Sequence, residues 1–363
     1  MIEQLNLFGE KQEKSTDWKW WFKDYPKSNG LKVFSCFACG GGSTMGYKLC
    51  GCEVLGCNEI DPRMNEIYVA NHHPKYNFLE DIRDFNKRTD LPLELYNLDI
   101  LDGSPPCSTF SMVGDRENSW GKKKKFREGQ KEQTLDDLLF IFIDTVEKLQ
   151  PKVAIMENVE GLLLGNAWAY VQEIYKRFEK IGYKVKHFLL KGEEMGIPQT
   201  RHRVFFVATK LNFNLDKIDI YFNYEKVTYG EIKGNEKGAE LNKNTIAYKY
   251  IDKYANENDL RLGDVFKKVG EKERCFSTKI AWDKNVLQTI TANLIYIDGK
   301  EKTRIPLNSI ISAQTFPQDF NFLDKTYSNV SYICGMSVPP VMVKRLVTKL
   351  IESGLFDYKL KKE

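Results

Sequence analysis

The chain of 363 residues lacks any apolar run near the ~18 residues that a membrane-spanning helix needs. It also lacks a signal-peptide core, because the stretch between Glu3 and Lys11 is short and polar. A strong excess of either charge is missing as well, since 54 basic and 50 acidic residues leave a net charge of +4. We therefore expect a cytoplasmic protein without a membrane partner, and charge alone does not indicate a nucleic-acid binder.

A complete set of zinc ligands is also missing, although the chain has eight cysteines. Five of them fall in one short stretch, namely Cys36, Cys39, Cys50, Cys52 and Cys57. Cys36-x-x-Cys39 could open a zinc site, but no second Cys-x-x-Cys or His-x-His completes it. Free cysteine packs as a small apolar residue, so we predict no metal site and expect Cys36, Cys52 and Cys57 to be buried in core strands.

What the sequence does contain is an alternation of apolar strands with helices, over a length that suggests about two domains. A last amphipathic helix is expected over residues 341–351 and should dock back on the first domain. The order predicts an α/β fold with a doubly wound, mostly parallel sheet and helices on both faces. The expected strands are residues 31–37, 53–58, 97–101, 152–156 and 203–208.

The clearest helix covers residues 135–149, where apolar side chains recur at steps of three and four positions. Thr134 can cap its start, and Pro151 ends it. A shorter helix that ends at Leu49 is expected after the first strand and the glycine run that follows it, with Ser43 or Thr44 as its cap.

A glycine-rich loop precedes this shorter helix, with the sequence Phe37-Ala38-Cys39-Gly40-Gly41-Gly42. Glycines there let the backbone turn sharply and approach a ligand, and an acidic residue about 20 positions later, here Glu59, can bind a ribose hydroxyl. The dinucleotide fingerprint G-x-G-x-x-G would need a glycine at Met45, however, and the next glycine is Gly46. The spacing favours a nucleoside cofactor other than a nicotinamide dinucleotide, although a dehydrogenase would use a similar loop.

Four further motifs follow along the chain. They are Gly103-Ser104-Pro105-Pro106-Cys107, Glu157-Asn158-Val159, Gln199-Thr200-Arg201-His202-Arg203 and Gly335-Met336-Ser337-Val338-Pro339-Pro340. Cys107 and Glu157 both follow expected strands, so both should lie at the carboxyl edge of the sheet, where open parallel sheets bind ligands. Together with the glycine loop, the motifs resemble the DNA cytosine-5 methyltransferase family of bacterial or phage type over most of residues 31–209 and 286–350.

The resemblance implies a class I, Rossmann-like methyltransferase fold with S-adenosylmethionine as cofactor. Phe37 and its loop would surround the methionine part, Glu59 would bind the ribose, and Ile60 would lie against the adenine. The implied cofactor residues are Phe37, Ala38, Cys39, Gly40, Gly41, Gly42, Glu59, Ile60, Asp81, Ile82, Pro105, Leu138, Ser337 and Val338. Cys39 stands where the family usually has glycine, and Met336 where it usually has asparagine, which predicts altered contacts at the methionine end.

Four residues carry the chemistry that the resemblance implies. Carbon 5 of cytosine is a weak nucleophile, so the ring must first be activated by attack at carbon 6, which the Cys107 thiolate can make. Glu157 would donate a proton to ring nitrogen N3, a task that needs a carboxyl group able to keep or share a proton. Arg203 would hold the cytosine carbonyl oxygen, and Arg201 would support the loop or the thiol. The sequence does not identify the base that removes the proton from carbon 5.

The implied substrate is double-stranded DNA, and a cytosine inside a duplex must be flipped out before Cys107 can reach it. The candidate closing loop covers residues 108–133, and its positive bias suits contacts with phosphate. Its candidate DNA contacts are Arg116, Lys122, Lys123, Lys124 and Lys125. An ordinary solvated loop is the alternative.

The composition becomes polar and rich in tyrosine and asparagine from about residue 212 to 302. We therefore predict an N-terminal extension over residues 1–30 and a catalytic domain over 31–224 and 325–363. A smaller target-recognition domain with its hinge is expected over 225–324. The resemblance also allows a cognate restriction endonuclease as partner and predicts a monomer associated with the nucleoid.

Two other functions stay open. Cys275-Phe276-Ser277 partly resembles the Cys-Phe-Thr signature of a tRNA-modifying branch of the family, although the long variable region favours DNA. The second alternative is a non-catalytic DNA-binding relative, against which the intact Cys107, Glu157 and Arg203 argue.

The N-terminus carries a separate motif that catalysis does not need. Gln4-Leu5-Asn6-Leu7-Phe8 resembles the short peptide by which bacterial replication and repair proteins bind the sliding clamp. Leu5, Leu7 and Phe8 would be its apolar anchors and Gln4 a hydrogen-bonding residue, followed by a polar tether over residues 9–16. The alternative is that the apolar side chains pack on the protein itself, with Trp18, Trp20 and Trp21.

Overall fold

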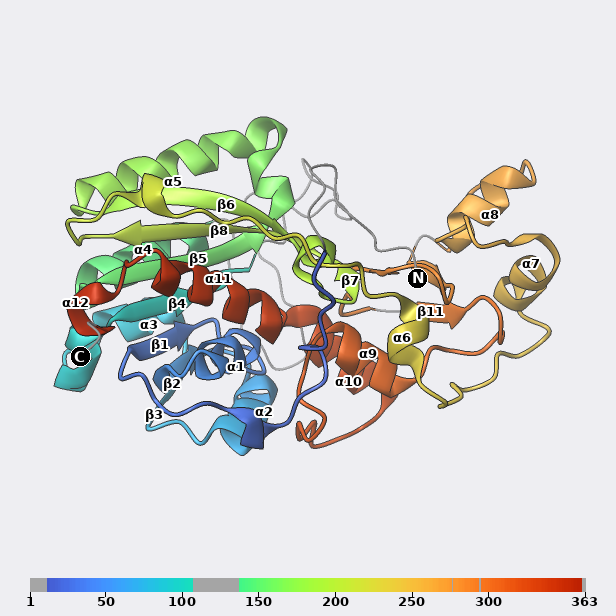
Figure 1. Cartoon of the computed structure of the whole chain (residues 1–363), viewed down its shortest axis with the longest axis horizontal. Coiled ribbons are helices and arrows are strands. Elements are labelled where there is room, and N and C mark those ends of the chain that lie inside the picture. The colour runs from blue at the N-terminus through green and yellow to red at the C-terminus, as the bar shows by residue number, and fades with distance from the viewer. Residues whose placement is uncertain (1–11, 107–136, 276, 294, 361–363) are drawn as a thin grey trace. The chain divides into compact units, whose positions relative to one another are not determined.

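The computed structural model describes residues 12–106, 137–275, 277–293 and 295–360 (Figure 1). The chain divides into two compact units. The first, which we call the sheet unit, comprises Tyr25–Leu190, His202–Tyr221 and Val343–Glu363. The second, the insert unit, comprises Met1–Asp24, Lys191–Arg201 and Phe222–Met342. Most of the predicted site motifs belong to the sheet unit.

The sheet unit is built on a seven-stranded sheet of order β3-β2-β1-β4-β5-β8-β6. The pairs β3–β2, β2–β1, β1–β4 and β4–β5 are parallel, and β5–β8 is antiparallel. This confirms the predicted doubly wound, mostly parallel sheet. The strands are β1 (Lys32–Cys36), β2 (Glu53–Glu59), β3 (Tyr76–Leu79), β4 (Ile100–Gly103), β5 (Val153–Val159), β6 (Lys184–Lys191) and β8 (His202–Thr209).

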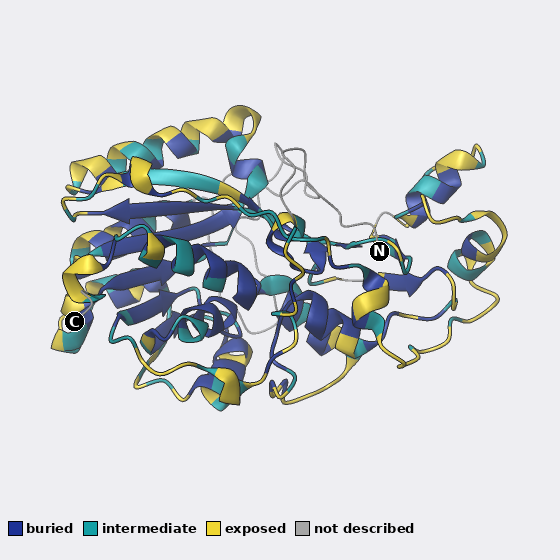
Figure 2. Cartoon of the chain, viewed as in Figure 1, coloured by how far each residue is buried: buried dark blue, intermediate teal, exposed yellow. Residues whose placement is uncertain are grey.

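Different helices cover the two faces of this sheet. Phe34, Leu101 and Met156 pack in one large core with α3 (Ile82–Lys87), α4 (Leu138–Leu149) and α5 (Trp168–Lys180). The other face carries α1 (Gly42–Leu49) and most of α11 (Pro340–Glu352), where the Cys50 thiol donates to the Lys344 carbonyl at 3.1 Å. Figure 2 shows β1, β4, β5 and β8 as almost wholly buried. The last long helix thus docks on the sheet unit, as its pattern predicted.

The order of the strands reverses between β1 and β4, which lie side by side although β2 and β3 separate them in the sequence. Ser35 is in register with Asp102, and Cys36 with Gly103. Open α/β sheets bind ligands at such a point, outside the carboxyl ends of the two strands. The glycine loop follows β1 and the Pro-Pro-Cys loop follows β4, so both motifs start at this edge.

The start of α1 differs from the sequence-based expectation. Gly41 is the N-cap residue, no side chain caps the helix, and α1 begins at Gly42. The left-handed φ of 87° at Gly41 starts the helix early, so Ser43 and Thr44 lie inside its first turn. Their hydroxyl groups bond instead to Asp102 and to a tyrosine of α2 (Pro62–His72).

The predicted long helix corresponds to α4, which begins at Leu138 with Asp137 as N-cap and no side-chain cap bond. Thr134, the predicted cap, lies outside the described residues. The helix ends at Leu149 because Gln150 adopts a left-handed φ of 49° directly before Pro151.

The insert unit has short helices and two small parallel strand pairs, β9–β11 and β7–β10. Its own core joins α7, α8, β9 and β11 through residues such as Ile251, Phe266 and Ile297. Its elements are β7 (Gln199–Thr200), α6 (Tyr229–Lys233), α7 (Ile246–Tyr254), α8 (Leu262–Lys268), β9 (Thr278–Ala281), β10 (Leu287–Gln288), β11 (Ile295–Asp298), α9 (Leu307–Ala313) and α10 (Tyr327–Met336).

The remaining helices are short. They are α12 (Asp357–Leu360) and the 3-10 turns η1 (Phe22–Asp24), η2 (Leu93–Asn97), η3 (Glu160–Leu163), η4 (Gly165–Ala167), η5 (Gly192–Met195) and η6 (Leu215–Lys217). Over the part of the chain that the structure describes, no helix combines the length and apolar character that crossing a membrane requires.

The segment before the sheet belongs to the insert unit. Glu13 forms a parallel bridge with Tyr224, and its carbonyl accepts from the Glu225 amide at 2.9 Å. Trp20 is buried, and its indole nitrogen donates to the Thr315 carbonyl at 2.8 Å. The expectation of a flexible tether is therefore wrong for residues 12–16, because backbone pairing holds them against the insert unit.

Candidate active site

The glycine loop after β1 has a left-handed backbone at three positions. Phe37 has a φ of 55°, Cys39 of 47° and Gly41 of 87°. A side chain at Gly41 would also collide with a neighbour, since an added Cβ would lie 2.0 Å from His72 Nε2. Glycine is thus required at Gly41 by both φ and space, whereas Cys39 accepts a conformation that glycine would adopt without strain.

The side chain of His72 packs against the glycine loop. It is buried, its ring lies 4.7 Å from that of Tyr68, and its Nε2 lies 3.2 Å from the Gly40 carbonyl. Burial, with a smaller effect of the Lys48 charge, lowers the pKa of His72 to about 3. The imidazole is therefore neutral at physiological pH and acts as a packing and hydrogen-bonding group.

Glu59 joins the glycine loop to the end of β2. Its carboxylate accepts from the backbone amides of Cys39 (2.7 Å), Ile60 (2.8 Å) and Asp61 (2.9 Å). Burial raises the pKa of Glu59, and these amide bonds partly offset the rise. The predicted ribose ligand is thus fixed at the carboxyl edge with both oxygens oriented by backbone groups.

The next strand places a second carboxylate at the same edge. Asp81 follows β3 and caps α3, where its side chain accepts from the Arg83 amide at 2.8 Å. Ile82 is buried beside it, and Ile60 is half-buried after β2. Two carboxylates and a glycine turn along one edge match the hydroxyls, the amine and the close backbone approach of a nucleoside, so the residues fit the adenosine part of S-adenosylmethionine.

Asn158 holds the start of the cysteine loop and was not among the predicted site residues. It is 1% exposed, and its amide nitrogen donates to the Pro105 carbonyl at 3.2 Å. At the end of β4, a Cβ on Gly103 would lie 2.3 Å from the Phe142 ring, so strand and helix pack tightly there. Cys107 itself lies outside the described residues.

Glu157 and Arg203 form the central ion pair of the site. Arg203 Nε lies 2.7 Å from Glu157 Oε1, and the two side chains are only 14% and 10% exposed. Both residues lie within paired strands, since Val159 of β5 faces Arg203 of β8. The prediction that Glu157 follows its strand is wrong in detail, because β5 continues to Val159. Arg203 Nη1 also donates to the His202 carbonyl at 2.7 Å.

Asp102 in β4 is a second buried acid that the sequence reading missed. It is 2% exposed, and it accepts from the hydroxyls of Ser35 (2.7 Å), Ser43 (2.7 Å) and Tyr47 (3.0 Å). Burial raises its pKa to about 6, with these hydrogen bonds acting against the rise and Glu157 adding to it. A single aspartate in an apolar strand, directly before the Gly-Ser-Pro-Pro motif, was the available signal.

Arg201, Ser337 and Val338 belong to the insert unit. Arg201 is 3% exposed and donates to the carbonyls of Ile290 (2.9 Å) and Gly335 (3.3 Å). Ser337 is also buried, and its carbonyl accepts from Gln314 at 2.7 Å. Within that unit, Arg201 therefore supports backbone segments, including the one that precedes Ser337.

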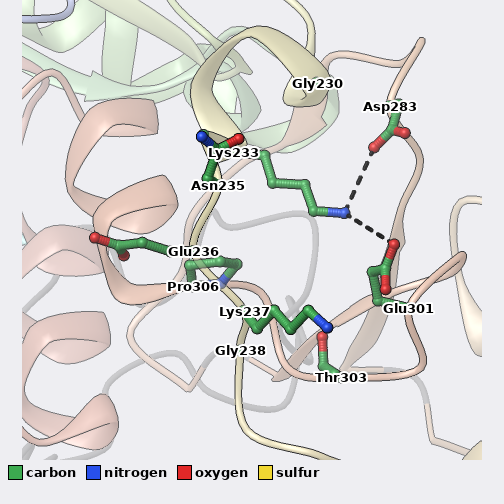
Figure 3. A pocket seen from close by; sticks show the side chains of 11 residues that line it. Gly230, Lys233, Asn235, Glu236, Lys237, Gly238, Asp283, Glu301, Thr303 and Pro306 are labelled. Carbon is green, nitrogen blue, oxygen red and sulfur yellow. Dashed lines mark ion pairs between the residues drawn. The ribbon is translucent and has the colours of Figure 1, made fainter.

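The insert unit also contains a polar pocket of about 350 Å³ (Figure 3). Lys233 points into it, with Asp283 at 3.8 Å and Glu301 at 3.9 Å. Its shortest ion pair is with the buried Asp298, at 2.6 Å, and Tyr229 donates to the same carboxylate at 2.9 Å. Because Lys233 is engaged in this way, we assign the cluster a structural role.

The remaining predicted residues fall into two groups. Leu138 is 1% exposed and packs in the main core of the sheet unit. The predicted DNA and clamp contacts lie outside the described residues, namely Arg116, Lys122, Lys123, Lys124, Lys125, Gln4, Leu5, Leu7 and Phe8. Cys36, Cys52 and Cys57 are buried, and the described ranges contain no group of three or more His, Cys, Asp or Glu side chains that could hold a metal ion.

The sheet order, the antiparallel strand β8 beside β5 and the glycine turn after β1 define the fold of class I S-adenosylmethionine-dependent methyltransferases. Two solved structures share this fold, with TM-scores of 0.60 and 0.57 and identities of 16% and 15%. They are Spodoptera frugiperda DNMT2 (89% of this chain, 100% of that chain) and S. pombe Dnmt2 methyltransferase (90% and 99%).

The family model described as C-5 cytosine-specific DNA methylase matches residues 31–352, so the chain belongs to that family. It is 26% identical over 362 residues to the type II methyltransferase M.FnuDI of Fusobacterium nucleatum, covering 92% of this chain and 98% of that protein. It is also 26% identical over 352 residues to M1.HphI of Haemophilus parahaemolyticus, at 89% and 87% coverage. The protein is thus a DNA cytosine-5 methyltransferase with S-adenosylmethionine as cofactor and double-stranded DNA as substrate.

Proposed function

We propose that this enzyme methylates carbon 5 of a cytosine within a specific duplex sequence, through a covalent bond between Cys107 and carbon 6 of a flipped base. The observation that carries the proposal is the largely buried Glu157–Arg203 pair, 2.7 Å apart near the carboxyl end of β5. Asn158, the next residue, holds Pro105 and so fixes where the loop toward Cys107 begins. An acid, a guanidinium and a thiol-bearing loop thereby start from neighbouring strand ends.

The first step is addition to the ring. The Cys107 thiolate forms a bond to carbon 6, and the C5–C6 double bond shifts to C4–C5. The C4–N3 electron pair takes a proton from Glu157 at N3, which leaves an enamine that is nucleophilic at carbon 5. Arg203 is placed to share the carboxyl group of Glu157 and, in the complex, to donate to the cytosine carbonyl oxygen. The bound cofactor supplies the methyl group as an electrophile.

The second step is elimination. After carbon 5 has taken the methyl group, a base removes the proton from that carbon, and the bond between carbon 6 and the Cys107 sulfur breaks. The thiolate leaves, and N3 returns its proton to the Glu157 carboxylate. A duplex must release the target base into the site for either step, since a stacked base is out of reach.

A duplex with 5-fluorocytosine at the target position tests this mechanism. Fluorine takes the place of the proton that must leave, so a covalent complex should accumulate, and peptide mapping should locate it at Cys107. The target sequence would first be found by sequencing methylated DNA. Cys107→Ala should form no adduct and still bind the cofactor. A stable adduct at another residue, or turnover by Cys107→Ala, would remove Cys107 from this role.

Specificity should reside in the insert unit. Residues 225–300 are rich in Lys and Asn and contain one Gln and two Arg, and all four kinds of side chain read base edges in the major groove. Exchanging this segment for that of a relative should change the methylated sequence and keep the chemistry. Duplex DNA and tRNA should be compared in the same assay, because methylation of tRNA alone would favour the RNA-modifying alternative, to which Cys275-Phe276-Ser277 points.

We further propose the bacterial sliding clamp as a partner of residues 4–8. The match of residues 4–8 to the clamp-binding peptide supports this proposal. A peptide of residues 1–12 should bind the clamp, and Leu7→Ala with Phe8→Ala should abolish binding without changing methylation of short duplexes. A peptide that does not bind would favour the alternative, in which Leu5, Leu7 and Phe8 pack on the protein itself.

The remaining partner and location assignments follow from the substrate. We propose that the enzyme works as a monomer on nucleoid DNA in the cytoplasm, and that a cognate restriction endonuclease reads the same sequence. The type II relatives support the last point. Sedimentation of the purified protein would test the monomer, and cleavage of unmethylated DNA by extracts of the source cells would test the endonuclease.

A further inference from the structure

Asp102 is a buried carboxylate that the proposed chemistry does not use. Its three bonding partners, Ser35, Ser43 and Tyr47, are all neutral hydroxyl groups. Among the residues that the structure describes, no Lys, Arg or His nitrogen forms an ion pair with it. A carboxylate that is 2% exposed and lacks a cationic partner is costly to bury.

The other titratable groups that face Asp102 do not supply a positive charge. They are Cys36 on β1, Tyr47 on α1, Tyr68 on α2 and Glu157 on β5. Burial raises the pKa values of Cys36, Tyr47 and Tyr68 well above their usual range, so these groups are neutral. Hydroxyl dipoles and the start of α1 offset part of the charge, and the surroundings of Asp102 stay net negative.

The fold neutralises buried carboxylates elsewhere. Asp99, just before the start of β4, is paired with Lys152 at 2.9 Å and with Lys359. In the insert unit, Asp298 is paired with Lys233 at 2.6 Å. Glu59 at the same edge also has no cationic partner among the described residues, but three backbone amides bind its carboxylate. Asp102 differs from all of these acids in having only hydroxyl groups as hydrogen-bond donors.

Asp102 lies within the sheet, close to the points where the glycine loop and the Pro-Pro-Cys loop begin. It is in register with Ser35 of β1, one residue before Cys36 and the glycine loop, and it precedes Gly103 at the end of β4. Its bond to Ser43 reaches the first turn of α1, directly after the glycines. The carboxylate is thus placed under the segment that would surround the methionine part of the cofactor.

We propose that Asp102 provides the counter-charge for the sulfonium of bound S-adenosylmethionine and thereby favours this cofactor over the uncharged product S-adenosylhomocysteine. The inference rests on the cofactor site described above. A fixed negative charge in a low-dielectric site attracts a ligand cation and is indifferent to a neutral ligand of the same shape. Loss of the positive charge on methyl transfer would then weaken binding of the product and speed its release.

Calorimetric titration of the full-length protein with three ligands tests the proposal. S-adenosylmethionine and sinefungin carry a positive charge at this position, and S-adenosylhomocysteine does not. Asp102→Asn should weaken both cationic ligands roughly fivefold relative to S-adenosylhomocysteine at pH 7.5. In the wild type the same preference should fall as the pH drops below about 6, whereas in Asp102→Asn it should not change.

Two further variants separate charge from positioning. Asp99→Asn removes the buried carboxylate just before β4. It should leave the preference for cationic ligands over S-adenosylhomocysteine unchanged. Exchanging the register partners, Ser35→Asp with Asp102→Ser, keeps one carboxylate in the cluster and should restore the preference.

Equal weakening of all three ligands by Asp102→Asn, or an unchanged preference, would overturn the proposal. Failure of the wild type to bind S-adenosylmethionine would instead contradict the cofactor site itself. The two failures are therefore distinguishable.

Discussion

Two buried aspartates, one in each unit of the molecule, show opposite solutions to the same problem. Asp102 in the sheet unit is 2% exposed, bonds only to hydroxyls, and has its pKa raised to about 6 by burial. Asp298 in the insert unit is 1% exposed and is surrounded by Lys233, Tyr229 and the backbone amide of Glu301. Burial alone would raise the pKa of Asp298 too, but these partners lower it.

The comparison shows that Asp298 stabilises the insert unit, whereas charged Asp102 lowers the stability of the sheet unit. Asp298 holds a helix end and a turn together, and its contribution is present at neutral pH. Asp102 is destabilising when charged, and such a cost persists where a site needs it. Asp298→Asn and Asp102→Asn test this comparison directly, and Gly41→Ala and Cys39→Gly test the glycine loop of the sheet unit.

The largest effect is expected from Asp298→Asn. It leaves Lys233, whose side chain is 15% exposed, without its charged partner, and should destabilise the protein by about 3–5 kcal/mol. Urea denaturation would measure this, and hydrogen exchange should rise in residues 222–342. The stabilising effect of Asp298 is present above its unfolded pKa and is lost as the pH falls through the lowered folded value. Asp283→Asn, which removes long pairs to Lys233 at 3.8 Å and to the exposed Lys300 at 3.7 Å, is the control and should cost below about 1 kcal/mol.

Gly41→Ala should come next. The new Cβ would lie 2.0 Å from His72 Nε2 at a φ of 87°, so strain and overpacking together should cost about 3 kcal/mol and weaken cofactor binding. Gly182→Ala is the matched control, since Gly182 has a φ of 84° and nothing within 4 Å of an added Cβ. Equal losses of stability in the two variants would show that a Cβ at Gly41 can be accommodated next to His72.

Asp102→Asn should have a smaller effect that depends on pH in the opposite direction to Asp298→Asn. The raised pKa means that the protonated form stabilises the fold below the unfolded value and that this contribution is lost as the pH rises through about 6. Between about pH 4 and pH 7 the free energy of unfolding of the wild type should therefore fall by about 2–3 kcal/mol relative to that of the variant. Thermal denaturation of both proteins across this range would measure the change. A wild type that becomes less stable than the variant toward acid pH would contradict a raised pKa for Asp102.

Cys39→Gly should have the smallest effect and should be stabilising. A φ of 47° costs a side-chain residue about 1 kcal/mol that glycine avoids. His73→Gly, at the same φ of 47°, should stabilise as much without touching the cofactor loop. If only Cys39→Gly also changes cofactor affinity, the departure of this position from the family pattern is functional.

Much of the sheet unit could be predicted from the sequence, because apolar periodicity sets its strands and helices. The glycine loop and the strand before it follow from local patterns, and the alternation of strands with helices predicts the parallel sheet but not which strands are neighbours in it. The Glu157–Arg203 contact required the antiparallel register of β5 and β8, which no local pattern gives.

Other features depend on contacts between distant residues. Asp102 looked like one polar residue in an apolar strand, and its three hydroxyl partners come from β1 and α1. The capping expected of Ser43 failed for the same reason, since a tertiary acceptor competes with the helix end. The anchoring of residues 12–16 came from a bridge to Tyr224, far along the chain.

Bisulfite sequencing of DNA from cells that express the wild type or Cys107→Ala tests the central claim most directly. Methylation at carbon 5 protects cytosine from conversion, so the wild type should leave protected cytosines at one recurring short sequence. Cys107→Ala, expressed at the same level, should leave none. Complete conversion with the folded wild type, or protection that persists in Cys107→Ala, would contradict cytosine-5 methylation through this thiol.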